Sequence, residues 1–66
     1  MRIRVNGEWA QLEARTIADV LRHYGLEHKK VVVEADGTIV ERTRWDSTAV
    51  TDGMILEIVQ IGRAHV

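Results

Sequence analysis

Cysteine and proline are both absent from the 66-residue chain. Without cysteine the chain can form no disulfide and no thiolate metal site. The three histidines, His23, His28 and His65, are scattered and form no cluster of metal ligands. No apolar run approaches the roughly 20 residues of a membrane-spanning helix, and Met1–Val5 is too polar for a signal peptide. We therefore expect a cytoplasmic protein with no metal, no bound cofactor and no membrane contact.

The charges are nearly balanced. Nine lysine and arginine residues stand against ten aspartate and glutamate residues, which gives a net charge of −1. This balance argues against a nucleic-acid partner, because binding to phosphates requires an excess of positive charge. The hydrophobic content of 45% is typical of a folded domain. A domain this small buries only about 60% of its unfolded surface, which leaves too little structure to enclose an active site. We therefore expect that the protein is not itself an enzyme.

Turn signals divide the chain into short strands. Asn6-Gly7 and Asp36-Gly37 are typical of two-residue hairpin turns, whose central residues need positive φ. Asp52-Gly53 marks a third turn. Alternating or β-branched residues on either side favour strands. We predict strands over residues 1–5, 8–12, 31–35, 38–40 and 54–61.

One segment has the pattern of a helix. Thr16 and Asp19 have the spacing of a capping box. The apolar stripe that follows consists of Ile17, Val20, Leu21 and Tyr24. Gly25 stands where a left-handed residue ends a helix, and Leu26 supplies the apolar contact after it. The sequence predicts a helix over residues 17–24.

The order of elements is therefore β-β-α-β-β-β, with the helix between the second and third strands. The helix and the sheet each have one apolar face, and these faces must pack on each other. Residues 41–48 are polar except for Trp45, and we interpret them as a loop or helical turn held by that ring. The predicted fold is α+β, a ubiquitin-like β-grasp with a mixed sheet of four to five strands and one main helix. We assign this domain to residues 1–60.

Few residues could carry chemistry. His23 lies beside Arg22, away from the apolar stripe, and is interpreted as a solvated surface residue. No Ser/His/Asp or Cys/His set has the spacing of an activated nucleophile, and the glycines are isolated turn residues rather than a phosphate loop. Trp9 and Trp45 are interpreted as core or partly core residues. We predict no catalytic residue.

The last strand predicts a surface for a partner. Glu57 must face water, so Leu56 and Ile58 face the core and the odd-numbered residues face outward. The same alternation places an apolar patch on the outer sheet face, made of Val32, Val59 and Ile61. Exposed patches of this kind mark partner surfaces. The alternative is that long side chains such as Arg4 or Gln60 cover the patch.

The order and spacing of several segments resemble the ThiS family of sulfur carrier proteins in thiamine biosynthesis. The segments are residues 3–8, the helix 16–21, the run 33–42, then Trp45, 50–53 and 56–59. The resemblance implies a carrier whose C-terminal glycine is adenylated by an E1-like adenylyltransferase that uses ATP. A sulfur donor protein then converts this adenylate to a thiocarboxylate, and a thiazole synthase takes the sulfur. Small subunits of molybdopterin synthase, in the same MoaD/ThiS superfamily, share this fold and carrier logic.

The last residues depart from the family. The Gly-Gly end would fall near Ala64 and His65, so no thiocarboxylate attachment site is intact in this chain. Residues 61–66 are also the amino acids that the codons ATC GGA AGA GCA CAC GTC encode, and this nucleotide string is the start of a common short-read library adapter. We interpret them as an atypical tail, best explained as a sequencing artefact after Gln60. On this explanation Ile61 is not native, and Val59 is the only native residue that the end of the last strand contributes to the patch. A clipped precursor and a ubiquitin-like binding module without conjugation are the alternatives.

Overall fold

The computed structural model describes residues 1–61. The elements follow in the order β1 (Arg2–Val5), β2 (Glu8–Gln11), α1 (Ile17–His23), β3 (Val31–Ala35), β4 (Thr38–Val40), the 3-10 helix η1 (Arg42–Arg44) and β5 (Ile55–Gln60). The predicted helix and all predicted strands are present, and each boundary differs by at most one residue. Residues 62–66, which make up most of the atypical tail, lie outside the described part of the chain.

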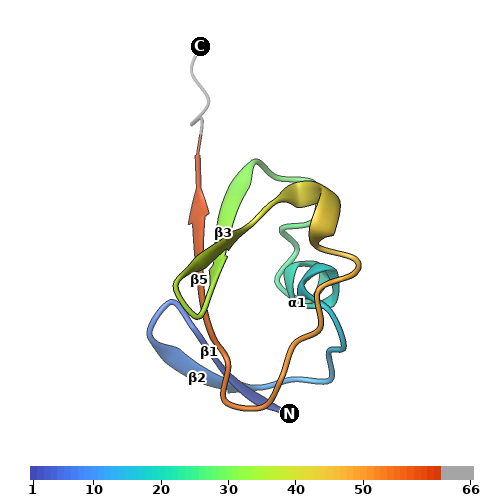
Figure 1. Ribbon diagram of the computed structural model, residues 1–66. Helices are drawn as coiled ribbons and strands as arrows, with labels where there is room; N and C mark the ends of the chain where they lie inside the picture. The colour runs from blue at the N-terminus through green and yellow to red at the C-terminus, as the bar shows by residue number, and fades with distance from the viewer. Residues whose placement is uncertain (62–66) are drawn as a thin grey trace.

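The five strands form one mixed sheet in the order β2-β1-β5-β3-β4. The central strands β1 and β5 are parallel, and every other neighbouring pair is antiparallel. Helix α1 follows the first hairpin and covers one side of the sheet (Figure 1). One helix packed on a five-stranded mixed sheet confirms the ubiquitin-like β-grasp prediction.

Both hairpins turn through residues in the left-handed region. Asn6 and Gly7 have φ values of 51° and 85°, and Asp36 and Gly37 have values of 50° and 87°. Positive φ at both central positions is the geometry of a type I′ turn, whose twist matches that of the paired strands. The turn residues therefore set the register in which Arg4 pairs with Trp9 and Glu34 pairs with Ile39.

Helix α1 is capped at both ends. The Thr16 side chain accepts from the Asp19 N–H, and the Asp19 carboxylate accepts from the Thr16 N–H, which completes the capping box. At the other end the Leu26 N–H donates to the Leu21 carbonyl at 2.8 Å. Gly25 adopts φ 71° between them, so the helix ends in a Schellman motif.

Tyr24 does not belong to the buried stripe, and the prediction was wrong on this residue. It is the C-cap, with a φ of −93° and a ψ of 4°. Its backbone is no longer helical, so its side chain does not continue the apolar stripe. Its ring is 41% exposed and packs edge-on against the exposed His23, with 4.9 Å between ring centroids. The apolar stripe of α1 therefore ends at Leu21.

The core lies between α1 and the inner face of the sheet. Its fully buried side chains are Ile3, Ile17, Val20, Leu21, Val33 and Leu56. Trp45 closes one side of this core, and its Nε1–H donates to the Val40 carbonyl at 2.9 Å. The prediction that this ring holds the turn after β4 is confirmed.

The long connection between β4 and β5 is tied to the start of α1. The Ala18 N–H donates to the Trp45 carbonyl at 3.1 Å, and the Ile17 N–H donates to the Thr48 carbonyl at 3.1 Å. The first N–H groups of a helix lack partners within the helix, so these carbonyls satisfy them. The connection thereby completes the layer that covers the inner face.

Candidate interaction surface

Strand β5 divides its side chains between the two faces of the sheet. Leu56 and Ile58 point into the core, while Glu57 and Val59 point outward. Leu56 has no exposed surface, whereas Val59 is 56% exposed. The alternation predicted for the last strand is therefore confirmed.

The structure brings together the three residues predicted to bind a partner, which we call the outer patch: Val32, Val59 and Ile61. Val32 and Val59 are direct partners in the β3–β5 ladder. The Ile61 N–H donates to the Lys30 carbonyl at 2.9 Å, so the chain remains bonded to the sheet through Ile61. The patch lies where β5 ends, beyond the start of the strand, which pairs with β1 (Figure 1).

The outer patch is part of a wider apolar surface. Six large hydrophobic residues are exposed among residues 1–61, and five of them lie on the outer sheet face or its continuation past β5. These five are Trp9, Ile39, Ile55, Val59 and Ile61. Sequence reasoning missed Ile39, because a strand of only three residues carries too little alternation to assign its faces. The signal was its pairing with Glu34 across the hairpin.

Trp9 is not a core residue, and the interpretation from sequence was wrong. It is 46% exposed on the outer face, because the alternation that turns Ala10 inward also turns Trp9 outward. The guanidinium carbons of Arg2 and Arg4 lie 4.3 Å and 5.8 Å from its ring centroid. Arg4 therefore lies over Trp9 rather than over the outer patch.

Asn6 holds the half of β5 that carries the outer patch. Its Nδ2 donates to the Ile58 carbonyl at 3.0 Å, and the Ile58 N–H donates to its Oδ1 at 2.7 Å. The side-chain amide thus continues the β1–β5 ladder beyond the point where β1 turns away. Near Val59, β5 is therefore held on one edge by Asn6, which bonds to Ile58, and on the other edge by β3, in which Val32 pairs with Val59.

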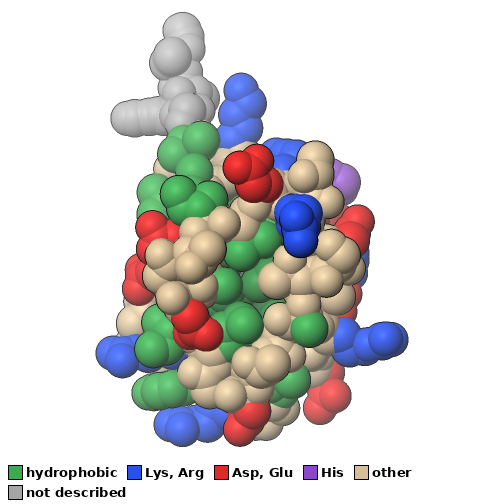
Figure 2. Space-filling model, viewed as in Figure 1, with side chains coloured by type: hydrophobic (Ala, Val, Ile, Leu, Met, Phe, Trp, Pro, Cys, Tyr) green, Lys and Arg blue, Asp and Glu red, His purple; other side chains and the backbone are tan. Residues whose placement is uncertain are grey.

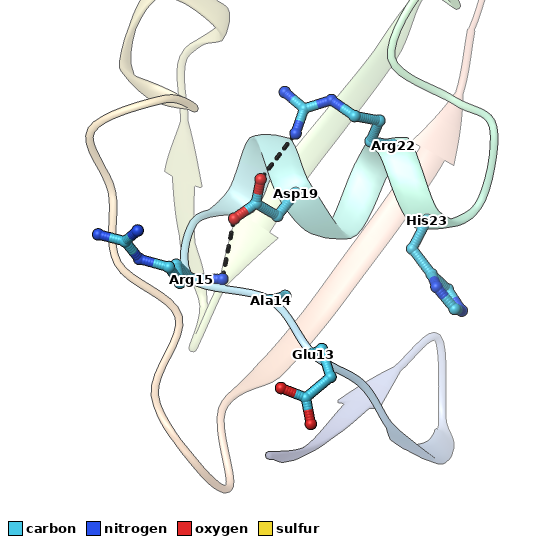
Figure 3. Close-up of a pocket in the computed structure, with 6 residues that line it drawn as sticks. All are labelled: Glu13, Ala14, Arg15, Asp19, Arg22 and His23. Carbon is cyan, nitrogen blue, oxygen red and sulfur yellow. Dashed lines mark hydrogen bonds and ion pairs between the residues drawn. The ribbon is translucent and has the colours of Figure 1, made fainter.

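A second feature is a shallow charged groove beside α1, lined by Glu13, Ala14, Arg15, Asp19, Arg22 and His23 (Figure 3). The N–H groups of Arg15 and Thr16 donate to the Asp19 carboxylate and hold the pKa of Asp19 below its usual value. Arg22 adds an ion pair at 2.7 Å. The side chains of Arg15, Arg22 and His23 point in different directions (Figure 3). Asp19 in this groove therefore caps the helix, and the charged side chains that line the groove do not converge as catalytic groups would.

Two further findings concern residues 1–61. They contain no group of three or more side chains placed to hold a metal ion. They also contain no helix long and apolar enough to cross a membrane. The strongest candidate surface in this part of the chain is therefore the outer sheet face.

A β-grasp domain with an exposed apolar face beside the end of β5 has the architecture of a ubiquitin-like carrier or binding domain. The sequence model of the ThiS family matches residues 3–62. The chain therefore belongs to the ThiS family. The match covers the helix and all strand residues except Arg2, so it includes both the core and most of the outer face.

Two solved structures are similar over nearly the whole chain. The crystal structure of the thiamine biosynthesis protein ThiS from Geobacter metallireducens superimposes with a TM-score of 0.82 and is 25% identical, covering 98% of this chain and 100% of that one. The solution NMR structure of a thiamine biosynthesis protein from Geobacter metallireducens gives a TM-score of 0.78 at 25% identity, covering 100% of this chain and 91% of that one. No curated protein matches the sequence.

Proposed function

We propose that this protein is a sulfur carrier of thiamine biosynthesis, a co-substrate of enzymes rather than a catalyst. The observation that carries the proposal is the ThiS family match over residues 3–62. The Geobacter metallireducens protein of the same fold is itself named as a thiamine biosynthesis protein. The outer patch supports the proposal, because a carrier needs a surface by which each enzyme can hold it.

In this proposal the chemistry takes place at a C-terminal glycine carboxylate. An E1-like adenylyltransferase joins that carboxylate to the AMP part of ATP and releases pyrophosphate. Sulfur from a donor protein then displaces AMP, which leaves a thiocarboxylate, and a thiazole synthase takes the sulfur. Two terminal glycines suit this path, since residues without Cβ can pass through a narrow channel. The carrier itself binds no cofactor, and ATP is used by the activating partner.

The position of the outer patch fits a carrier that supplies the carboxylate while partner enzymes carry out the chemistry. The chain is hydrogen-bonded to the sheet through Ile61, which lies two residues past Val59. A partner that binds the outer patch is therefore held at the end of β5, the strand that precedes the carrier's C-terminal segment. Binding energy from the patch can position the carboxylate without any catalytic group on the carrier.

The test is a mass measurement on two proteins. One is the chain as printed, and the other has residues 61–66 replaced by a tail that ends in Gly-Gly. Each is incubated with a ThiS-activating adenylyltransferase, ATP and a sulfur donor. We expect the Gly-Gly protein to gain the mass difference between sulfur and oxygen, and to gain nothing when ATP is omitted.

The ThiS protein of Geobacter metallireducens serves as the positive control for the enzymes. If that control is charged and the Gly-Gly protein is not, the carrier proposal is wrong. Retained binding to the adenylyltransferase without charging would then favour a ubiquitin-like binding module. Charging only by the molybdopterin-synthase pathway enzyme would instead place the chain in that related branch.

A further inference from the structure

The outer face carries two charged regions in addition to its apolar residues. Arg2 and Arg4 project from β1 beside Trp9, and Glu34 and Glu57 project from β3 and β5. Within residues 1–61, no ion pair involves any of these four charged side chains. Along the sheet side of the molecule, acidic side chains lie below the apolar ones near the end of β5, and basic ones lie at the base (Figure 2). The face therefore presents adjoining positive and negative areas to the solvent.

The acidic area is unfavourable in a single molecule. Glu34 and Glu57 are direct partners in the β3–β5 ladder, and like charges placed directly opposite each other destabilise a sheet. On this face Ile39 pairs with Glu34, and Val32 and Val59 form the next pair along the strands. Arg4 is a diagonal neighbour of Glu57, because it pairs with Ile55, but neither glutamate forms an ion pair within residues 1–61. Positive groups from another molecule would relieve this repulsion.

The basic area has the composition of a binding hot spot. Tryptophan and arginine are enriched among the residues that dominate binding energy, and Trp9 lies exposed beneath two guanidinium groups. Stacking on the ring holds these guanidinium groups while leaving their N–H donors unpaired with any carboxylate of residues 1–61. Such donors are suited to carboxylates.

We propose that two copies of this chain associate through their outer sheet faces about a twofold axis. In this arrangement Arg2 and Arg4 of each copy face Glu34 and Glu57 of the other. A twofold interface must be self-complementary, and this face supplies two positive and two negative side chains. Ile55 pairs with Arg4 and lies two residues before Glu57 on β5. It is therefore placed between the basic and the acidic area, where the two Ile55 side chains can make apolar contact across the axis.

The size and charge of the molecule permit this association. A stable interface buries about 800 Å² on each partner, which is less than a fifth of the 4603 Å² accessible surface. The net charge of −1 adds little long-range repulsion between copies. Because the pairing is largely electrostatic, the association weakens as salt rises.

Self-association would also affect the proposed carrier role, although it does not depend on that role. Val59 lies on the same face as Arg4 and Glu57. A second copy on this face would therefore cover the outer patch. Partner enzymes would have to compete with the second copy for the carrier.

The test is sedimentation equilibrium of the full chain at low ionic strength over a range of concentrations. We expect a reversible dimer whose dissociation constant rises with added salt. One variant reverses the basic area (Arg2→Glu with Arg4→Glu), and the other reverses the acidic area (Glu34→Arg with Glu57→Arg). Each variant alone is expected to dissociate at least about tenfold more readily, because like charges would then face each other.

The decisive step is to mix the two variants in equal amounts. Each then presents the charges that the other lacks, so we expect a heterodimer to form where neither variant dimerises alone. Arg44→Glu, an exposed charge reversal outside the strands, is the matched control and should dimerise normally. The indole N–H signal of the buried Trp45 in an NMR spectrum reports that each variant is folded. A monomeric parent chain, or variants whose association the mixture does not restore, would overturn the proposal.

Discussion

The two faces of the sheet use similar residues for different purposes. On the inner face Ile3, Val33 and Leu56 are fully buried against α1. On the outer face Ile55 and Val59 are comparable aliphatic side chains that remain exposed. Adjacent residues of β5 thus differ in environment only because a strand alternates its side chains. Apolar surface for the core is scarce in a small domain, so we propose that these exposed aliphatic residues serve binding rather than folding.

The comparison implies that inner-face changes alter stability and outer-face changes alter association. The largest expected difference is between Leu56→Ala and Val59→Ala. Leu56→Ala removes fully buried methyl groups and should lower the free energy of unfolding by about 2–5 kcal/mol. Val59→Ala should lower it by less than about 1 kcal/mol. Urea unfolding followed by circular dichroism measures both values, and equal losses would contradict the division between the faces.

The second prediction concerns Asn6 in the first hairpin. Its side chain bonds to the main chain of β5, the strand whose side chains alternate between the two faces. Asn6→Gly keeps the positive φ without strain but removes both hydrogen bonds to Ile58. We expect a loss of about 1–3 kcal/mol in unfolding free energy. Hydrogen exchange should show earlier loss of protection at the Ile58 N–H than at the Val33 N–H.

Asn6→Asp is the matched variant for this prediction. It keeps an oxygen that accepts from the Ile58 N–H but loses the donor to the Ile58 carbonyl. Protection of the Ile58 N–H should therefore survive better in Asn6→Asp than in Asn6→Gly. Equal exchange in the two variants would show that the side chain does not hold β5.

A smaller effect concerns the helix that covers the inner face. The pKa of Asp19 is lowered because the Arg15 and Thr16 N–H groups donate to its carboxylate. A lowered pKa in the folded state adds stability that is present above the unfolded value of about 3.9. That stability is lost as the pH falls through the folded pKa. Asp19→Asn should therefore flatten the acid dependence of stability, and an unchanged pH profile between pH 5 and the acid transition would contradict this.

The smallest effect is expected at the acidic area of the outer face. Glu57→Gln removes the like-charge pairing with Glu34 and should raise the unfolding free energy by a few tenths of a kcal/mol, at most about 1 kcal/mol. Thermal unfolding at low salt measures it, and the gain should shrink as salt is added. A loss of stability would mean that Glu57 makes a favourable contact in the isolated molecule.

The sequence was sufficient to predict the fold because its local signals agree with one another. The Asn6-Gly7 and Asp36-Gly37 turns, the caps of α1 and the alternation of β5 each specify a local geometry. The three residues of the outer patch followed from the same alternation. Their role in partner binding remains a prediction.

The errors arose where local patterns give way to tertiary geometry. Tyr24 continues the helical spacing but lies one residue past the helix, so spacing alone assigned it to the core. Trp9 was assigned by the usual burial of tryptophan, although the alternation of its own strand already pointed it outward. The bonds between Asn6 and Ile58 join residues 52 positions apart, and no local pattern reports a contact of that range.

The most direct test of the central claim is the affinity of the Gly-Gly protein for its activating adenylyltransferase before and after Val59→Asp. Tyr24→Ser, which removes an exposed ring away from the sheet, is the control. We predict that Val59→Asp weakens binding by about tenfold or more, because a charge would enter an apolar contact, while the control binds normally. Unchanged affinity in a folded Val59→Asp protein would show that the outer face is not the surface by which this carrier is held.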